Sequence, residues 1–242
     1  MRLLIEFSPT YAVSYREINN YFIHSMIWRK LKNTTFSDLH DSKGFKYFNF
    51  SNIFPVEDFV EGKRYKLIIS SPMESFIYTL KDQFEKEPLI RLGKHIFVLS
   101  STKVFKLPLG ERWELGSPLV LYKNNFKDEK KLEYYSFEKH KDFEFFFNRI
   151  KENALKKYNS FTGKEFDFKF FMFDSFRFKR TVVHKLNKDG KEFVIIGTLG
   201  EFELPKIRSK EVRKFYEFVQ EVGLGEKNSL GYGFLNPWKN EQ

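Results

Sequence analysis

Residues 65–84, YKLIISSPMESFIYTLKDQF, indicate the fold class, because a strand pattern changes into a helix pattern inside them. Residues 65–70 are mostly apolar, which is typical of a strand. Ser71-Pro72-Met73-Glu74 then combines a capping box with a proline at the first helical position, so a helix is predicted to start there. The apolar side chains that follow recur at helical spacing: Met73, Phe76, Ile77, Leu80 and Phe84.

The segments on either side of this stretch complete one topological unit. Residues 2–7 are predicted to form a strand, residues 15–32 an amphipathic helix, and residues 45–50 a second strand. Residues 95–107 supply a closing strand after the helix that starts at Ser71. The resulting order, β-α-β-β-α-β, is that of the ferredoxin-like motif.

The second half of the chain repeats this order with different residues. A strand is predicted near 119–122, a long helix at about 140–158, and strands at 166–180 and 193–204. Another helix follows, which Ser209 can cap, and a short strand ends at Leu235. The predicted fold class is therefore α+β, with two tandem ferredoxin-like domains at residues 1–116 and 117–242.

A glycine cluster, GLGEKNSLGYG at residues 223–233, lies between the last helix and the last strand. A nucleotide-binding G-x-G-x-x-G turn follows a strand and opens a helix, so the context here excludes a Rossmann site. The cluster is instead predicted to offer backbone N–H groups, together with Lys227 and Asn228, to an extended polyanion.

The net charge indicates that this polyanion is a nucleic acid. The chain has 242 residues and carries 42 Lys and Arg against 32 Asp and Glu, a net charge of +10. Such an excess is expected of a protein that neutralises backbone phosphates, although anionic membranes and acidic proteins are alternative partners. Glu6 interrupts the N-terminus before a signal peptide could form, and no uncharged apolar run reaches the roughly 18 residues of a membrane span. The chain is expected to be cytoplasmic and not to enter a membrane.

Metal and cofactor sites are not indicated. Cysteine is absent, and none of the five histidines is spaced from another as in a zinc site. His40-Asp41 resembles a dipeptide of metal-dependent phosphohydrolases, but the further His and Asp ligands such a site needs cannot be assembled from the rest of the sequence. We therefore expect neither a metal nor a cofactor.

Phenylalanine is abundant, with 31 copies, and alternates at period two through residues 166–180. Most of these rings are expected in the core because one sheet face must pack on helices, whereas base stacking is the alternative for individual rings. The basic residues of the stretch are expected to face solvent and to be available to phosphates: Lys169, Arg177, Lys179 and Arg180.

His40 is the outstanding candidate for chemistry, because it lies in a polar connection, residues 37–46, between the first helix and the second strand. If the substrate is RNA, its own 2′-hydroxyl is a nucleophile, and cleavage needs only a proton acceptor, a proton donor and a nearby cation. His40 and Lys46 could supply an imidazole and an ammonium group. The alternative is that His40, beside Asp41, is an ordinary surface histidine.

One flank of the first helix carries side chains outside the apolar stripe: Tyr21, His24, Trp28 and Lys32. They either face a substrate or form a half-buried aromatic edge with a solvated histidine and lysine. Arg29 and Lys30 lie elsewhere on the helix and are expected to make general phosphate contacts, if any.

Three local patterns carry a resemblance to a known family. They are Gly223-x-Gly225-x-x-x-x-x-Gly231-x-Gly233 with EKNSL inside it, the N-terminal strand at residues 1–7, and LHDSKGFK at residues 39–46. In these the chain resembles the CRISPR-associated (Cas) endoribonucleases, sixth in the Cas naming series, which cut repeat transcripts into guide RNAs. The double β-α-β-β-α-β order extends the resemblance over the whole chain.

The resemblance implies metal-independent cleavage within CRISPR repeat RNA that leaves a 2′,3′-cyclic phosphate and a 5′-hydroxyl. By position, His40 resembles the catalytic histidine and Lys46 the lysine six residues further on. A helix tyrosine completes a triad in some members, but Trp28 stands here and cannot transfer a proton. Its indole N–H could position a phosphate or a base. The third group is left open among the following residues: Tyr21, His24, Lys30 and Tyr47.

The resemblance also implies that the glycine signature binds RNA, through Ser229 as well as its glycines, and that a CRISPR effector complex is a further possible partner. The alternative function is a non-catalytic repeat-RNA scaffold subunit of such a complex. A third class is a basic adaptor for anionic membranes or acidic proteins, which would show no preference for repeat RNA.

Overall fold

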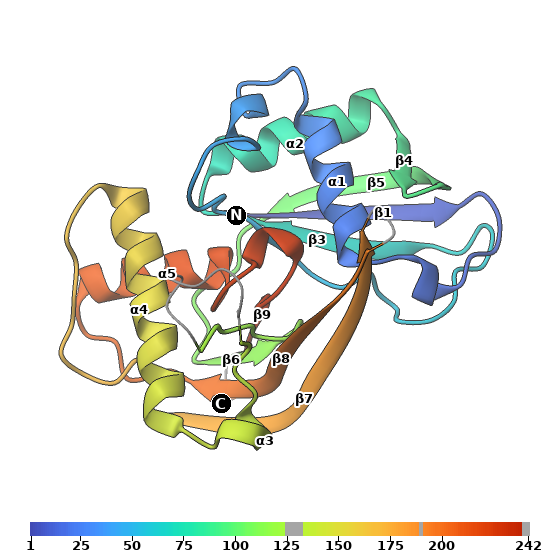
Figure 1. Ribbon diagram of the computed structural model, residues 1–242. Coiled ribbons are helices and arrows are strands. Elements are labelled where there is room, and N and C mark those ends of the chain that lie inside the picture. Colours follow the sequence, from blue (N-terminus) through green and yellow to red (C-terminus); the bar gives the residue numbers. More distant parts are fainter. Residues whose placement is uncertain (124–132, 189–190, 239–242) are drawn as a thin grey trace. The chain divides into compact units, whose positions relative to one another are not determined.

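The structure is a computed structural model that describes residues 1–123, 133–188 and 191–238 (Figure 1). It divides into two compact units, one made of Met1–Leu107 with Ser229–Gly231 and the other of Pro108–Asn228 with Tyr232–Gln242. The division falls before the boundary predicted near Ser117, because the strand at Arg112–Leu115 pairs within the second sheet. The tripeptide from the glycine cluster is grouped with the first unit.

The first unit is a five-stranded antiparallel sheet with two helices. Its strands have the order β2-β3-β1-β5-β4. The elements are β1 (Arg2–Pro9), α1 (Asn20–Leu31), β2 (Asn49–Phe50), β3 (Tyr65–Ser70), α2 (Glu74–Lys86), β4 (Leu89–Leu92) and β5 (His95–Phe105). Single 3-10 turns lie at η1 (Tyr15–Glu17) and η2 (Ser37–Leu39).

Both helices cover the same face of this sheet (Figure 1). The central strand β1 alternates, so that Leu3, Ile5 and Phe7 are buried against the helices. Glu6 points to the other face, where its carboxylate lies 3.1 Å from the ammonium of Lys66 on β3. The period-two pattern therefore sets which face receives α1 and α2.

Two helix starts differ from the sequence prediction. α1 begins at Asn20 rather than Tyr15, because Asn19 caps it by accepting the N–H of Phe22 at 3.1 Å. α2 begins at Glu74, after Met73 and not at Pro72. The Ser71 hydroxyl accepts the N–H of Met73 and donates to the carbonyl of Tyr47, so it shapes the turn before the helix.

The second unit repeats the topology. Its elements are β6 (Arg112–Leu115), α3 (Phe137–His140), α4 (Phe143–Thr162), β7 (Ser175–Lys188), β8 (Lys191–Glu203), α5 (Lys210–Val222), η4 (Asn228–Leu230) and β9 (Leu235–Trp238). The sheet order β7-β8-β6-β9 places the second, third, first and fourth strands side by side. The order β2-β3-β1-β5 in the first unit follows the same rule. The tandem ferredoxin-like prediction is thus confirmed, with β4 added as a hairpin on β5.

Three strand predictions in the second half are wrong in detail. Residues 119–122 form only isolated bridges, and the first strand of the sheet is β6, in which Trp113 and Leu115 are buried. The strand predicted from residue 166 begins at Ser175 and runs to Lys188, because β7 pairs with β8 along its length. The last strand begins, and does not end, at Leu235.

The alternating phenylalanines before β7 do not form a strand, and some of their rings pack against helix α5. Phe168 packs on Phe215 and Tyr216 of α5, with ring centroids 5.3 and 6.4 Å apart. Phe173 is also buried, as expected of a core ring, whereas Phe171 has 84% of its surface exposed. No helix among the described residues is long and apolar enough to cross a membrane.

Candidate active site

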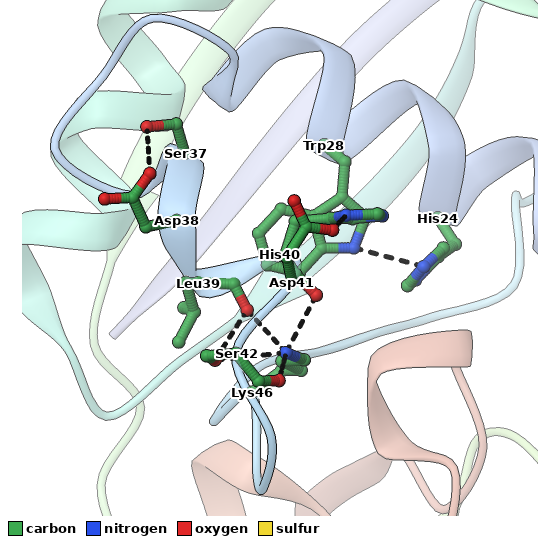
Figure 2. A network of polar contacts seen from close by, with 9 residues as sticks. All are labelled: His24, Trp28, Ser37, Asp38, Leu39, His40, Asp41, Ser42 and Lys46. Carbon is green, nitrogen blue, oxygen red and sulfur yellow. Dashed lines mark hydrogen bonds and ion pairs between the residues drawn. The ribbon is translucent and has the colours of Figure 1, made fainter.

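The polar connection between α1 and β2 is organised around the ammonium of Lys46. Its Nζ donates to the backbone carbonyls of Leu39, His40 and Ser42, with the His40 oxygen at 2.9 Å. Figure 2 shows the three carbonyls gathered around this nitrogen. Burial lowers the pKa of Lys46, and the carboxylate of Asp41 opposes part of that change.

Lys46 therefore holds the loop that carries His40. An ammonium group has three N–H donors, and three carbonyls are within reach of them here. From the sequence, Lys46 is predicted to supply the positive charge near the reacting phosphate. Its charge does lie beside the His40 peptide, but its hydrogen bonds are made inside the loop.

His40 presents an imidazole that can accept a proton. Its side chain is 52% exposed, and Nδ1 lies 2.6 Å from Oδ1 of Asp41. An ionised carboxylate only accepts hydrogen bonds, so the proton of a neutral ring is assigned to Nδ1 and the lone pair to Nε2. Among the described residues Nε2 has no hydrogen-bond partner. Asp41, which was weighed from sequence as a surface neighbour and as part of a phosphohydrolase-like dipeptide, thus orients the ring.

Trp28 forms the wall behind His40. The two rings meet edge to face, with centroids 5.1 Å apart and planes at 79°. The indole Nε1–H donates to Nε2 of His24 at 3.1 Å (Figure 2). This is the only donor of a tryptophan side chain, so the expectation that it positions a phosphate or a base is not met.

His24 and Lys30 are both engaged in structural contacts. Nδ1 of His24 lies 2.8 Å from the carbonyl oxygen of Ser229, so both ring nitrogens of His24 have partners in the protein. Lys30 is buried, and its ammonium binds the carboxylate of Glu87 at 3.0 Å and the carbonyl of Leu89 at 3.1 Å. Neither residue is free to act as the acid or base considered from sequence.

Tyr47 lies where the loop returns to β2. Its backbone is left-handed, with φ of 50°, and its carbonyl accepts the hydroxyl of Ser71 at 2.7 Å. Its ring lies beside Phe45, with centroids 6.1 Å apart. The structure therefore places Tyr47 by its turn geometry, and its role in proton transfer stays a prediction.

The glycine cluster is a conformational requirement. Gly223, Gly225, Gly231 and Gly233 all have positive φ. A Cβ on Gly233 would lie 1.9 Å from the carbonyl oxygen of Leu224, and one on Gly231 would lie 2.3 Å from the ring of Phe50. The motif is thus explained by backbone shape and close packing.

Several of its N–H groups are used inside the protein, against the expectation that they are offered to a polyanion. The N–H of Leu224 donates to Gly233 at 3.0 Å, that of Glu226 to Val120 at 2.8 Å, and that of Gly233 to Pro118 at 2.9 Å. These bonds close the loop on itself and on the segment before it. Direct phosphate binding through these three N–H groups would break the loop.

Lys157 on α4 was not among the residues predicted from sequence, although it holds the glycine cluster. It is 2% exposed, and its ammonium donates to Gly223 O at 2.7 Å, Gly225 O at 3.2 Å and Asn228 Oδ1 at 2.8 Å. Burial lowers its pKa to about 7, which the carboxylate of Glu226 partly opposes. The available signal was a lysine on the apolar stripe of α4, in line with Ile150 and Ala154.

Asn228 is likewise a structural residue. Its side-chain amide donates to the carbonyls of Leu224 and Tyr232, both at 2.9 Å, and its oxygen accepts Lys157. Lys227 lies with its ammonium 5.6 Å from the centre of the Tyr122 ring. Of the two polar residues expected to bind a polyanion, only Lys227 keeps a partly exposed charged side chain.

The basic residues of β7 face solvent as expected, but two of them are paired. Arg177 lies 3.0 Å from the carboxylate of Glu201, and Lys179 bridges Glu201 at 2.8 Å and Glu114 at 2.6 Å. These contacts lower the pKa of Glu201, with Lys179 as the largest cause. Arg180 is exposed and has no ion pair within the described part of the chain.

Metal-ligating side chains do not gather anywhere in the described ranges. No group of three His, Asp or Glu residues there could hold an ion.

Comparison with known proteins identifies the family. A family model described as CRISPR associated protein Cas6, C-terminal, matches residues 101–237. The CRISPR-associated endoribonuclease Cas6 2 of Methanocaldococcus jannaschii is 40% identical over 99% of this chain and 100% of its own length. The Cas6 1 endoribonuclease of the same organism is 27% identical over 90% of this chain and 85% of its own length.

Solved structures agree on the fold. A CRISPR associated protein Cas6 superposes with a TM-score of 0.72 at 21% identity and covers 98% of both chains. A Cas6-related protein of Pyrococcus furiosus gives a TM-score of 0.72 at 22% identity, covering 100% of this chain and 99% of its own. The full-length sequence match and the shared tandem fold lead to one conclusion: the chain is an endoribonuclease of the CRISPR-associated Cas6 family.

Proposed function

We propose that this protein cuts CRISPR repeat transcripts into guide RNAs by making the RNA attack its own phosphodiester. The observation that carries the proposal is His40, whose Nδ1 is held by Asp41 at 2.6 Å while its side chain is 52% exposed and Nε2 has no hydrogen-bond partner among the described residues. An imidazole nitrogen with a lone pair and no partner in the protein is suited to remove a proton from a substrate hydroxyl.

The reaction begins at the 2′-hydroxyl before the scissile bond. His40 Nε2 accepts the hydroxyl proton, the oxygen bonds to the adjacent phosphorus, and the bond from phosphorus to the 5′-oxygen breaks. The leaving oxygen takes a proton from solvent. The products are a 2′,3′-cyclic phosphate and a 5′-hydroxyl. The nucleophile belongs to the substrate, so the reaction needs no metal-bound water and no cofactor.

Lys46 serves this reaction by positioning His40. Its ammonium holds three carbonyls of the loop, including that of His40, and so fixes the backbone from which the imidazole projects. Holding a catalytic group within about 1 Å of its productive place is worth up to roughly 100-fold in rate. We assign Asp41 to ring orientation and Lys46 to loop geometry.

The partner is repeat RNA, which a net charge of +10 favours. Within the described part of the chain, the exposed Arg180 and the partly exposed Lys227 are the residues from the predicted RNA-binding set that keep available charge. A CRISPR effector complex is a further partner in keeping with the family. Both assignments rest on the family and the charge.

The test is cleavage of end-labelled repeat RNA by the purified chain in excess EDTA, with the product ends mapped. We expect cleavage in chelator, a cyclic phosphate end, and complete block by one 2′-deoxy substitution at the cut site. The variant H40A should bind the RNA and not cut it. Binding without cutting by the unaltered protein would instead indicate a scaffold subunit, and 5′-phosphate products would exclude attack by the 2′-hydroxyl.

A further inference from the structure

We infer that His24 is a positioning residue that links the glycine motif to the catalytic histidine. The link runs from the carbonyl of Ser229 through the ring of His24 and the indole of Trp28 to the ring of His40. This inference rests on the proposed function, because it assumes that His40 takes part in cleavage.

The hydrogen bonds define one form of the His24 ring. A tryptophan N–H can only donate, so Nε2 of His24 must accept it with a lone pair. A backbone carbonyl can only accept, so Nδ1 carries the proton that it receives at 2.8 Å. The neutral ring with its proton on Nδ1 satisfies both partners at once. No lone pair is left for proton transfer, which separates His24 from the catalytic group.

The contacts on α1 form a row one helical turn apart. The amide of Asn20 donates to the carbonyl of Leu230 at 2.9 Å, and His24 holds the preceding carbonyl, that of Ser229. Trp28 follows one turn later and contacts His40 instead of the motif. Asn20 and His24 therefore contact residues 229–230, and Trp28 at the other end of the row contacts His40.

Trp28 transmits the constraint because its ring orientation depends on His24. An indole can pack in two flipped orientations, and the bond from Nε1–H to His24 selects one of them. The selected ring is also packed on Phe48, with centroids 5.5 Å apart and planes at 75°. The face presented to His40 is therefore fixed by His24 on one side and by the core on the other.

The sequence separation of its residues makes this link dependent on tertiary folding. His24 and Ser229 lie 205 positions apart, so the bond forms only when the tripeptide Ser229–Gly231 has folded onto α1. Gly231 helps to seat the motif, since its missing side chain leaves room for the ring of Phe50. The Ser229 carbonyl thus fixes the His24 ring, which in turn orients Trp28 beside His40.

The experiment measures cleavage and binding separately. Single-turnover rates at saturating protein and dissociation constants are compared for the unaltered chain, H24A, W28F and the double variant. We expect H24A to lower the rate about 10- to 100-fold while the dissociation constant changes less than about threefold. Because His24 acts through Trp28, the double variant should be no slower than the slower single variant.

N20A is the matched control, since it removes the neighbouring bond to Leu230 and leaves the bonds of His24 to Ser229 and Trp28 in place. Its rate should stay within about threefold of the unaltered chain. H24Q, which can still accept the indole N–H, should recover part of the rate. A second readout is the indole N–H resonance of Trp28, identified among the three tryptophans by its loss in W28F. It should move in H24A and stay in N20A, provided that thermal melting shows both variants folded.

The outcomes separate the two claims. If the unaltered chain does not cut RNA, the proposed function fails, and this inference fails with it. If the unaltered chain cuts but H24A cuts equally fast, only the inference fails. Multiplying effects in the double variant, or a loss in H24A that lies wholly in RNA affinity, would likewise overturn the link.

Discussion

The buried side chain of Lys157 should make the free energy of unfolding depend on pH by a predictable amount. Burial lowers the pKa of this side chain from its ordinary value of 10.5 to about 7. Between these two values the unfolded chain binds a proton that the folded chain largely lacks. The free energy of unfolding therefore rises with pH in this window. Lys157 lowers this free energy most below pH 7.

The size of the effect follows from proton linkage. One proton over one pH step is worth about 1.4 kcal/mol, and Lys157 is half protonated in the folded chain at pH 7. The contribution of Lys157 to the free energy of unfolding should therefore increase by about 2 kcal/mol from pH 7 to pH 9. The variant K157M has no group to titrate at this place and should not show it.

The assay is urea unfolding at pH 7, 8 and 9, followed by circular dichroism. The unfolding free energy of the unaltered chain minus that of K157M should grow by about 2 kcal/mol over this range. K156M is the control, because Lys156 is the exposed neighbour on the same helix, and its difference should stay flat. A difference for K157M that stays constant, or falls as pH rises, would refute the reasoning.

Three further predictions concern the active-site loop and the glycine motif. K46M should slow single-turnover cleavage about 10- to 100-fold with little loss of RNA affinity, because the His40 loop loses its central hydrogen-bond donor. The control K43M, in the same loop, should cut at the unaltered rate. Equal rates for the two variants would contradict the role of Lys46. D41A should slow cleavage roughly tenfold or more, since the His40 ring loses its orienting acceptor, and an unchanged rate would remove Asp41 from the mechanism. G233A should lower the unfolding free energy by on the order of 3 kcal/mol in urea titrations, because its Cβ meets the Leu224 carbonyl in a left-handed backbone, and a change below about 0.5 kcal/mol would contradict the packing.

Local patterns were enough to predict the topology. The strand at Tyr65–Ser70 is found at its predicted place, and Ser209 caps α5 by accepting the N–H groups of Glu211 and Val212. Such signals depend on neighbouring residues, so they can be read from sequence. The strand β6 was missed because four residues carry too little pattern to be distinguished from a loop.

The phenylalanine stretch shows how tertiary packing overrides a local pattern. Alternation at residues 166–174 is typical of a strand, yet Phe168 contacts α5 while Phe171 faces solvent. A period-two pattern records only that alternate side chains are apolar. It does not say whether the partner is another strand or the side of a helix.

The candidate site was predicted only in its local part. His40 and Lys46 lie six residues apart and share a loop, so their association could be proposed from sequence. The direction of the Lys46 donors toward carbonyls could not, since it depends on how the loop closes. The bonds from His24 to Ser229 and from Lys157 to Gly223 join residues 205 and 66 positions apart, for which a single sequence has no signal.

In the proposed mechanism the imidazole of His40 removes the proton of the attacking 2′-hydroxyl. The most direct measurement is the single-turnover cleavage of repeat RNA by H40A and by the unaltered chain, in EDTA and under conditions where both are saturated with RNA. We predict a rate loss of at least about 100-fold for H40A, with RNA affinity kept and a 2′,3′-cyclic phosphate on the product of the unaltered chain. Cleavage by H40A at the unaltered rate would exclude His40 as the group that removes this proton.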